Sequence, residues 1–470
     1  MKKKAKVIAL FLVLAMTLSL VGCSSNNPTA GTQSPSSSTN NDTSNQTEKP
    51  EEIVLKFTYK QAASNDLLEK WLEEKKVIER FEAENPGIKI ELTPISSSEG
   101  DYATLLALKL SSETTAPDIF MEDTYMTATD AAAGYLACLD DYVANWDEWS
   151  HYLDGTKEAV KGTDGKIYGI PISTDSRGIF YNYKVFRDAG IPTPWQPTNW
   201  EEILDAARKI KAHDPSIEPF YMIVGKQNGE GVSMQTFEML LYGTGDQLYE
   251  NGKWVVKSKG LSDTFKFIEQ VYKTEKLGVS LDVALASDVG AQVNKGLADG
   301  TIGMYLAVAT TAGNWTSTGS YPVENLEQVI GFAAMPTQYG GDPATITMCG
   351  GWSWAISSHC KYKDEAFKFL AFCGNKENAT WRSLYDGRMS PRDDSTDIEE
   401  YAMRPYIKEM TAYMANAYVR PKHESYAMVS TQIQTIVEEL VSTDMTAEQA
   451  AEEYKSRVIS VVGNENTLTK

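Results

Sequence analysis

Residue patterns that perform catalysis are sparse in this sequence. The short spacings typical of a histidine-rich metal site do not occur among its four histidines, His151, His213, His359 and His423. The chain has no GxSxG nucleophile elbow and no Walker phosphate loop. Asp140 and Asp141 are adjacent and point apart on a helix or strand, so a solvated acidic turn explains them better than the carboxylate pair of a glycoside hydrolase. We therefore expect no enzyme, no cofactor and no metal.

Aromatic residues offer a different chemistry. The chain has 10 tryptophans and 24 tyrosines, and Trp315, Trp352 and Trp354 stand next to glycine, serine or asparagine. Aromatic rings stack on the apolar C–H faces of sugars, whose hydroxyls need fixed donors and acceptors. Core packing is the alternative for each of the three, and it has least weight for Trp352 because glycines precede it.

The N-terminal segment predicts export. Lys2, Lys3, Lys4 and Lys6 precede an apolar run over residues 7–21, which is too short to span roughly 30 Å of hydrocarbon comfortably. The run ends in Leu20-Val-Gly-Cys23, which resembles a bacterial lipobox and implies diacylation of Cys23. A plain signal peptide with a chance cysteine is the alternative. Residues 24–50 consist mainly of Ser, Asn, Thr, Gln, Gly and Pro and predict a tether.

Length and charge limit the remaining chain. A chain of 470 residues is long enough for two or three lobes with substantial cores. Its 44 basic residues face 64 acidic ones, for a net charge of -20, which argues against nucleic acid as a partner. The segment over residues 1–22 carries four lysines and no acid, so the acidity belongs to the mature protein.

Hydrophobic periodicity predicts the elements that position any site. Strands are expected at residues 53–59, 88–92, 118–121, 301–308 and 329–334, and helices at residues 66–82, 102–110, 200–211, 262–275 and 363–372. The opening βαβα series predicts a mainly parallel sheet covered by helices, where ligands bind at the carboxyl ends of the strands. Capping boxes are expected at Thr198 and Thr446.

Several ordered blocks resemble one family over nearly the whole mature chain. They include Ala116-Pro-Asp-Ile-Phe120, Asp164-Gly-Lys-Ile-Tyr-Gly-Ile-Pro171, Ile179-Phe-Tyr-Asn182 and Gly350-Gly-Trp-Ser-Trp-Ala-Ile-Ser357. The chain is similar to the extracellular solute-binding proteins of ABC transporters, family 1, the sugar-binding group related to maltose-binding protein. Met121 stands where the family often has tryptophan, and long insertions separate the late blocks, so maltose itself is not the expected ligand.

The resemblance implies a two-lobed α/β periplasmic-binding-protein fold of type II, closing on ligand by a hinge. After a signal peptide (1–22) and a lipidated tether (23–52), it places the first lobe at residues 53–173 plus 333–374. The second lobe is expected at residues 174–332 plus 375–470. The hinges are expected near residues 172–174, 332–336 and Gly374.

Carried over position by position, the resemblance implies contacts to a carbohydrate, most simply an oligosaccharide. The substrate-binding residues it implies, together with the three tryptophans, are Tyr59, Gln61, Glu122, Asp123, Tyr125, Asp175, Arg177, Arg388, Arg420 and Tyr426. Alternatives remain open: Asp123 as a helix N-cap, Asp175–Arg177 as a structural ion pair, and surface positions for Arg388 and Arg420.

The resemblance further implies a monomer that delivers its ligand to the permease subunits of an ABC importer. We expect it on the outer face of a Gram-positive membrane, held by its lipid anchor alone, with the periplasm of a Gram-negative cell as the alternative. A surface glycan-active enzyme and a ligand-binding partner of a sensor kinase are the alternative functions. The remaining cysteines, Cys138, Cys349, Cys360 and Cys373, are expected as mostly free thiols.

Overall fold

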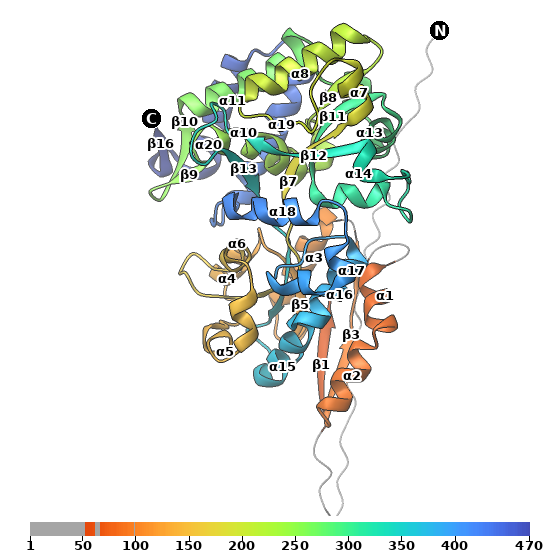
Figure 1. The fold of residues 1–470 in the computed structure, drawn as a ribbon. Helices are drawn as coiled ribbons and strands as arrows, with labels where there is room; N and C mark the ends of the chain where they lie inside the picture. The colour runs from red at the N-terminus through yellow and green to blue at the C-terminus, as the bar shows by residue number, and fades with distance from the viewer. Residues whose placement is uncertain (1–51, 62–65, 98) are drawn as a thin grey trace, which may run out of the picture. The chain divides into compact units, whose positions relative to one another are not determined.

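The computed structural model describes residues 52–61, 66–97 and 99–470 of the protein (Figure 1). The signal segment, Cys23 and the expected tether therefore lie outside the described residues. Within the described part of the chain, no helix is both long enough and apolar enough to span a membrane.

A five-stranded sheet forms the centre of the first lobe. Its strands, in spatial order, are β3 (Ile88–Leu92), β1 (Ile53–Thr58), β5 (Ile119–Asp123), β14 (Trp352–Ile356) and β6 (Ile170–Pro171). β1 is parallel to both β3 and β5, which confirms the expected parallel series, whereas β14 runs antiparallel to β5 and β6. Leu55 and Phe57 of β1 are buried while Val54 and Lys56 are exposed, as expected for a strand whose successive side chains point to opposite faces of the sheet.

A six-stranded sheet forms the centre of the second lobe. Its spatial order is β15 (Ala417–Tyr418), β13 (Thr345–Met348), β12 (Ile330–Pro336), β7 (Arg177–Asn182), β11 (Ile302–Val308) and β8 (Glu218–Tyr221). β7 is antiparallel to both neighbours, while β11 and β8 are parallel. All six residues of β7 are buried, including Arg177 and Asn182 at its ends, and its sequence does not alternate between polar and apolar residues.

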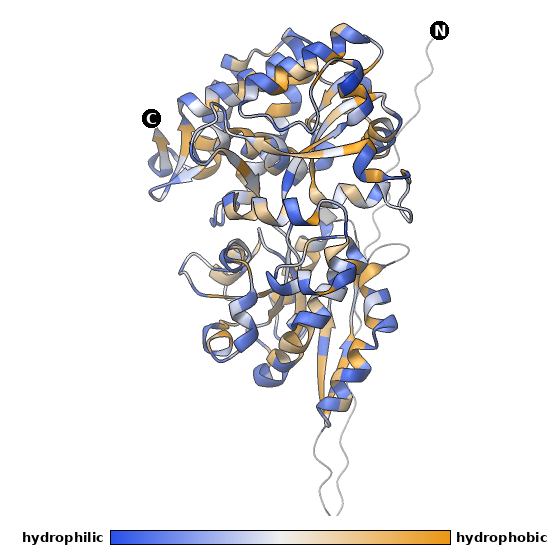
Figure 2. Ribbon diagram, in the orientation of Figure 1, coloured by the Kyte–Doolittle hydropathy of each residue, from blue (hydrophilic) through white to orange (hydrophobic). Residues whose placement is uncertain are grey.

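Each lobe has its own hydrophobic core. Phe57, Trp71 and Phe369 belong to the first, and Phe180, Phe237 and Trp315 belong to the second. Figure 2 shows the strands of both sheets mainly in orange and the outer faces of the covering helices mainly in blue. This pattern is typical of sheets covered by amphipathic helices.

The helices of the first-lobe chain segments include the three predicted regions and four further helices that were not predicted. They are α1 (Leu67–Glu74), α2 (Val77–Glu84), α3 (Glu99–Leu110), α4 (Thr127–Ala132), α5 (Asp140–Ala144), α6 (Asp154–Ala159), α15 (Lys363–Gly374) and α16 (Lys376–Asp386). Of these, α4, α5, α6 and α16 were not predicted. The single helix expected at residues 66–82 is broken into α1 and α2, because Lys76 adopts a left-handed conformation with φ of 49°. Asp66 caps α1 by accepting hydrogen bonds from the backbone N–H groups of Leu68 and Glu69.

Helices also surround the six-stranded sheet. They are α7 (Tyr183–Asp188), α8 (Trp200–His213), α9 (Glu230–Val232), α10 (Met239–Gly243), α11 (Lys259–Glu269), α12 (Leu281–Ala284), α13 (Val289–Asp299), α14 (Leu326–Val329), α17 (Glu399–Ala402), α18 (Ile407–Tyr413), α19 (Tyr426–Ser442) and α20 (Ala447–Val462). A capping box at Thr446 opens α20, as expected. At α8 the cap is Asn199 rather than Thr198, and Glu202 accepts a hydrogen bond from the Thr198 backbone N–H.

Two short sheets complete the fold. β2 (Lys60–Gln61) pairs with β4 (Ile95–Ser96), and β10 (Lys253–Lys257) lies between β9 (Tyr249–Glu250) and β16 (Thr467–Thr469). The second of these joins the C-terminal end of the chain to the second lobe.

The chain passes between the sheets at three connections that hydrogen-bond to one another. The first follows β6, the second joins β13 to β14, and the third follows α16. Thr174 and Met389 exchange two backbone hydrogen bonds of 2.9 and 3.1 Å, which pair the first connection with the third. Gly351, in the second connection, has φ of 132°, and a Cβ there would lie 2.2 Å from the Ser173 carbonyl oxygen. Only glycine therefore fits this close approach.

The strand pairing corrects two of the three expected boundaries. Residues 333–348 belong to β12, β13 and the turn between them, so they pair with the six-stranded sheet rather than with the first lobe. The second connection therefore lies at residues 349–351, not at 332–336. Likewise α16 packs against α1 and its Tyr385 donates a hydrogen bond to Glu74, so the chain leaves the first lobe after Asp386 rather than at Gly374. The first connection lies near the expected residues 172–174.

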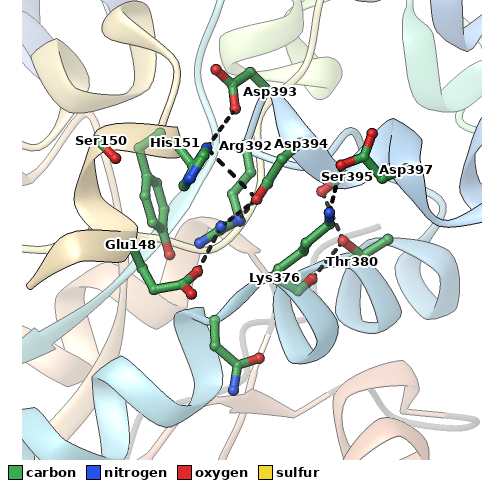
Figure 3. Close-up of polar contacts among 12 residues, drawn as sticks. Glu148, Ser150, His151, Lys376, Thr380, Arg392, Asp393, Asp394, Ser395 and Asp397 are labelled. Carbon is green, nitrogen blue, oxygen red and sulfur yellow. Dashed lines mark hydrogen bonds and ion pairs between the residues drawn. The ribbon is translucent and has the colours of Figure 1, made fainter.

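An ionic network fastens the third connection to the first lobe (Figure 3). The buried guanidinium of Arg392 makes two hydrogen bonds to Asp394, a third to the Gly374 carbonyl, and an ion pair of 2.6 Å with Glu148. The backbone of Asp393 donates to His151 O over 2.9 Å. The connection is thus held on its first-lobe side by one buried arginine.

Candidate functional site

A cavity of about 580 Å³ lies between residues of the two lobes and the connections that join them. Asp123, Tyr125 and Trp352 line it from the first lobe, and Asp175, Gly350 and Gly351 from the connections. β5, β8 and β11 of the two sheets all end at it, since Asp123 ends β5, the 223–231 segment follows β8, and Val308 ends β11. The carboxyl ends of strands thus surround the cavity, as expected for an α/β binding site. We call it the interlobe cavity.

Asp123 and Arg420 connect its two walls. Arg420 Nη2 donates to Asp123 Oδ1 and to Thr124 Oγ1, each over 2.9 Å. Its guanidinium lies 5.1 Å from the ring centre of Tyr125, within the range of a cation–π contact. Arg420 is 8% exposed, so it does not take the surface position that was the alternative, and its contact with a ligand stays a prediction. Asp123 does not cap α4, whose N-cap position is Met126.

Asp175, Arg177 and Arg388 form the hinge side of the cavity. Arg177 Nη1 donates to Asp175 Oδ1 over 2.5 Å and to Met348 O over 2.6 Å. The two residues are therefore both a buried structural ion pair and part of the cavity wall, so the two interpretations of the sequence are compatible. Arg388 lies 3.9 Å from Asp175 and its side chain remains 30% exposed, which leaves guanidinium donors for a ligand.

Trp352 separates the interlobe cavity from a second hollow. The hollow has a volume of about 240 Å³ and is also lined by Lys60, Leu67 and Met121. Trp352 and Arg388 line both spaces. The indole packs edge-on against Tyr102, with 5.9 Å between ring centres, and the Tyr102 hydroxyl donates to Met121 O. One aromatic ring is thus held rigidly between two adjoining spaces.

Tyr426 lies beneath the cavity rather than in its wall. It is 1% exposed, and its hydroxyl lies 2.9 Å from Glu230 Oε2 and 2.8 Å from Glu238 Oε1. Glu230 itself lines the cavity and lies 3.6 Å from Arg420. The predicted ligand contact at Tyr426 is therefore replaced by a supporting position under Glu230.

Glu122 is another site prediction that the structure does not support. Since successive side chains of a strand point to opposite faces, Glu122 points away from the cavity that Asp123 lines. It is 1% exposed and hydrogen-bonded to buried Asp130. Burial raises the pKa of both carboxyl groups, so the pair retains protons that two solvated acids would release.

Core packing accounts for two of the three tryptophans. Trp315 is fully buried, donates from its indole N–H to Asn294 O over 2.8 Å, and packs against Phe180. Trp354 is 2% exposed and packs edge-on against Phe57 at 4.9 Å. Neither lines the interlobe cavity, because each points into the core of its own lobe.

Tyr59 and Gln61 also take a structural role. The Tyr59 hydroxyl and the Gln61 amide both donate to Glu69 Oε1, each over 2.7 Å. Burial is the main cause of the raised pKa of Tyr59. The pair ties the end of β1 to α1 and does not line the interlobe cavity.

One wall of the cavity comes from a segment that was not predicted from the sequence. After β8, the loop and short helix over residues 225–231 contribute Lys226, Gln227, Asn228 and Glu230. The signal was present, because a polar Gly225-Lys-Gln-Asn-Gly-Glu-Gly231 segment directly follows an apolar strand, and glycine lets backbone approach a ligand. The 225–231 segment contains no aromatic residue, and the search for sugar-stacking rings therefore did not include it.

Opposite charges in the cavity nearly balance. Carboxylates come from Asp123, Asp175 and Glu230, and cations from Arg177, Lys226, Arg388 and Arg420. Such a lining supplies many donors and acceptors without a strong net charge, which suits a neutral polyhydroxylated ligand better than a polyanion or a polycation.

A cluster with metal-ligating atoms lies outside this cavity. Among the described residues, His151, Asp393 and Asp394 bring such atoms within 4.8 Å of one another (Figure 3). Arg392 already binds both oxygens of Asp394, so the cluster is satisfied as an ion-pair network.

The described cysteines agree with the expectation of free thiols. Cys138 is exposed, whereas Cys349, Cys360 and Cys373 are buried and unpaired. Burial raises the pKa of Cys349 and Cys360 to about 12, so these thiols remain protonated.

A family model and the relatives of known description assign the chain to the same family. A family model described as bacterial extracellular solute-binding protein matches residues 70–380. The multiple sugar-binding protein of Streptococcus mutans is 26% identical over 310 residues, which cover 63% of this chain and 67% of that protein.

Solved structures match the fold. An ABC transporter solute-binding protein of Thermotoga lettingae, bound with alpha-D-tagatose, is similar with a TM-score of 0.70 and 22% identity, covering 87% of this chain and 100% of that chain. The maltose-bound MalE3 of T. maritima gives a TM-score of 0.69 at 21% identity, covering 87% of this chain and 100% of that chain. At these identities the likeness concerns the two-lobed fold.

Proposed function

Because the chain belongs to the bacterial extracellular solute-binding proteins, we propose that it captures a carbohydrate in the interlobe cavity and delivers it to the permease of an ABC importer. The observation that carries the proposal is the lining of the cavity: one rigid indole, Trp352, beside carboxylate and guanidinium groups of balanced charge. Aromatic stacking recognises the apolar C–H face of a sugar, and bidentate hydrogen bonding recognises its hydroxyl groups.

An oligosaccharide fits this lining better than a single sugar. The interlobe cavity of about 580 Å³ adjoins the 240 Å³ hollow through Trp352 and Arg388. A ligand that occupies both spaces would place successive sugar units on either side of the indole. The sugar-binding relatives and the tagatose- and maltose-bound structures support carbohydrate as the ligand class.

Ligand capture would involve closure of the lobes. Asp123 and Arg420 stand on opposite lobes, and the three connections meet at the base of the cavity. Contacts that a ligand makes to both lobes only in the closed state favour that state. Diacylation of Cys23 would hold a monomeric protein at the outer membrane surface, near the permease, since two acyl chains suffice for stable anchoring.

A thermal-shift screen tests this function. The mature protein is melted with mono- and oligosaccharides, and with amino acids and polyamines as controls. A sugar present at 100 times its Kd should stabilise the folded state by about 2.7 kcal/mol. Stabilisation by a polyamine and by no sugar would contradict the carbohydrate assignment. Release of shortened sugars on incubation would instead support a glycan-active enzyme.

A further inference from the structure

Glu238 is a fully buried carboxyl group directly behind the cavity wall. It ends a π-helical turn, Ser233–Glu238, whose Met234 and Gln235 line the interlobe cavity. π-helical turns interrupt helices most often at functional sites. The side chain has 0% exposure, so its ionisation state depends on its protein neighbours alone.

A count of hydrogens determines that state. The Tyr426 hydroxyl lies 2.9 Å from Glu230 Oε2 and 2.8 Å from Glu238 Oε1. A phenol has one proton, so it can donate to only one of these oxygens. The second contact is a hydrogen bond only if that carboxyl group itself carries a proton and donates it to the phenol oxygen.

The surroundings identify Glu230 as the ionised partner. Its Oε1 accepts hydrogen bonds from Ser430 Oγ and Gln434 Nε2, and its Oε2 lies 3.6 Å from Arg420. By contrast, Glu238 Oε2 is buried and has no hydrogen-bond partner among the described residues. Desolvation of a charged carboxylate would therefore cost much more free energy at Glu238 than at Glu230.

We propose that Glu238 holds a proton at neutral pH and donates it in a hydrogen bond to Tyr426, thereby positioning Glu230 and, through it, the ligand-facing Arg420. The hydrogen-bond chain runs from Glu238 to Tyr426 to Glu230, whose charge then holds Arg420 against Asp123. Glu238 is a positioning residue, and this regulation of the binding site rests on the proposed function.

The charged and titratable groups around Glu238 come from several elements. They are Glu230 on α9, Tyr242 on α10, Tyr426 on α19, Tyr454 on α20, Arg177 on β7 and Arg420. Burial and then the charge of Glu230 raise the pKa of Glu238 to about 8, against the opposing effects of Tyr426, Arg420 and Arg177. Above that pH, two carboxylates compete for one phenol hydrogen.

The sign of the pH effect follows. The pKa of Glu238 is higher in the folded protein than in the unfolded chain, so the folded protein binds this proton more tightly. The stability that the bound proton contributes is fully present below the unfolded pKa of about 4.3 and is lost as pH rises towards about 8. Ligand affinity should fall by up to about tenfold per pH unit above the folded-state pKa, because Arg420 loses its fixed position.

Infrared difference spectroscopy on the full protein without ligand tests the protonation. The spectrum of the wild type minus that of Glu238→Gln should show a carboxylic-acid carbonyl band at pH 6 that disappears above pH 9. Absence of that band at pH 6 would overturn the proposal. A Glu122→Gln variant identifies the acid band of the buried Glu122–Asp130 pair, whose pKa values are also raised.

A second variant keeps the test valid if Glu238→Gln does not fold. In Tyr426→Phe the Glu238 proton has no acceptor, so the acid band should shift in position, and an unshifted band would overturn the hydrogen-bond chain.

Titration with a sugar found in the thermal-shift screen then tests the positioning role of Glu238: the wild type should lose affinity from pH 7 to 9.5 and Glu238→Gln should not. Equal losses would overturn the positioning role. Failure of every sugar to bind would sink the proposed function and leave the infrared result intact.

Discussion

Arg420 of the second lobe donates a hydrogen bond of 2.9 Å to Asp123 of the first lobe, inside the cavity that both residues line. The same guanidinium contacts Tyr125 and lies near Glu230. The buried Arg420 guanidinium therefore connects the two lobes to each other and to Glu230. A ligand in the cavity must bind beside this pair or replace one of its members.

Arg420→Ala should lower the free energy of unfolding by about 1–3 kcal/mol, because it leaves the partly buried carboxylates of Asp123 and Glu230 without their partner. Urea unfolding measures the change. Lys226→Ala is the matched control, since Lys226 lines the same cavity with a side chain 59% exposed, and its effect should stay within about 1 kcal/mol. Equal effects of the two substitutions would argue against a structural role for the Arg420–Asp123 pair.

Trp352 and Trp354 provide a matched pair of substitutions within one strand. Trp352→Ala should weaken sugar binding by about 1–3 kcal/mol, since it removes the stacking surface between the two hollows. Trp354→Ala should instead lower stability by about 3–5 kcal/mol and leave the affinity of the folded protein nearly unchanged, because its ring packs against Phe57. Calorimetry and thermal melts separate the two effects. A larger affinity loss in Trp354→Ala would contradict this assignment.

The buried Glu122–Asp130 pair should make stability depend on pH. Burial raises the pKa of both groups, so the folded protein binds more protons than the unfolded chain and loses stability as pH rises above about 4. Glu122→Gln should therefore become more stable relative to the wild type as pH increases, by at most about 1.4 kcal/mol per pH unit. Urea unfolding between pH 4 and 8 measures this. Exposed Glu79→Gln is the control, and a pH-independent difference for Glu122→Gln would contradict a raised pKa of the buried pair.

Gly351→Ala should disrupt the contact between the first two connections. Its φ of 132° is strained for other residues, and the new Cβ would approach the Ser173 carbonyl oxygen to 2.2 Å. We expect a loss of at least about 1–3 kcal/mol in the free energy of unfolding. Gly341→Ala is the control, because no atom lies within 4 Å of its added Cβ and its backbone is not left-handed. A tolerated Gly351→Ala would show that the connections can separate without cost.

Local patterns predicted five of the strands, β1, β3, β5, β11 and β12. The strands predicted at residues 53–59 and 301–308 match β1 and β11 to within one residue. The break at Lys76 was missed because a left-handed lysine has no sequence signature. The boundary at residues 349–351 was missed because β12 and β13 form a hairpin across Tyr339 and Gly340, and long-range pairing decides which sheet such a hairpin joins.

Seven of the residues predicted to contact ligand line the cavity: Asp123, Tyr125, Asp175, Arg177, Trp352, Arg388 and Arg420. The resemblance to the family located most of them, and their contacts with a ligand remain predictions. Trp315, Trp352 and Trp354 are all buried, and Trp352 differs from the other two in lining the cavity, which no local pattern of glycine and tryptophan encodes. Glu230 and its loop lacked an aromatic signal, and only their place after β8 marks them.

The most direct test of the account is a crystal structure of the mature protein with the sugar that stabilises it most in the thermal-shift screen. We predict a sugar unit stacked on Trp352, with its hydroxyls within hydrogen-bond distance of Asp123 or Arg388. A sugar bound outside the interlobe cavity, or an interlobe cavity that takes up a polyamine and no sugar, would contradict it.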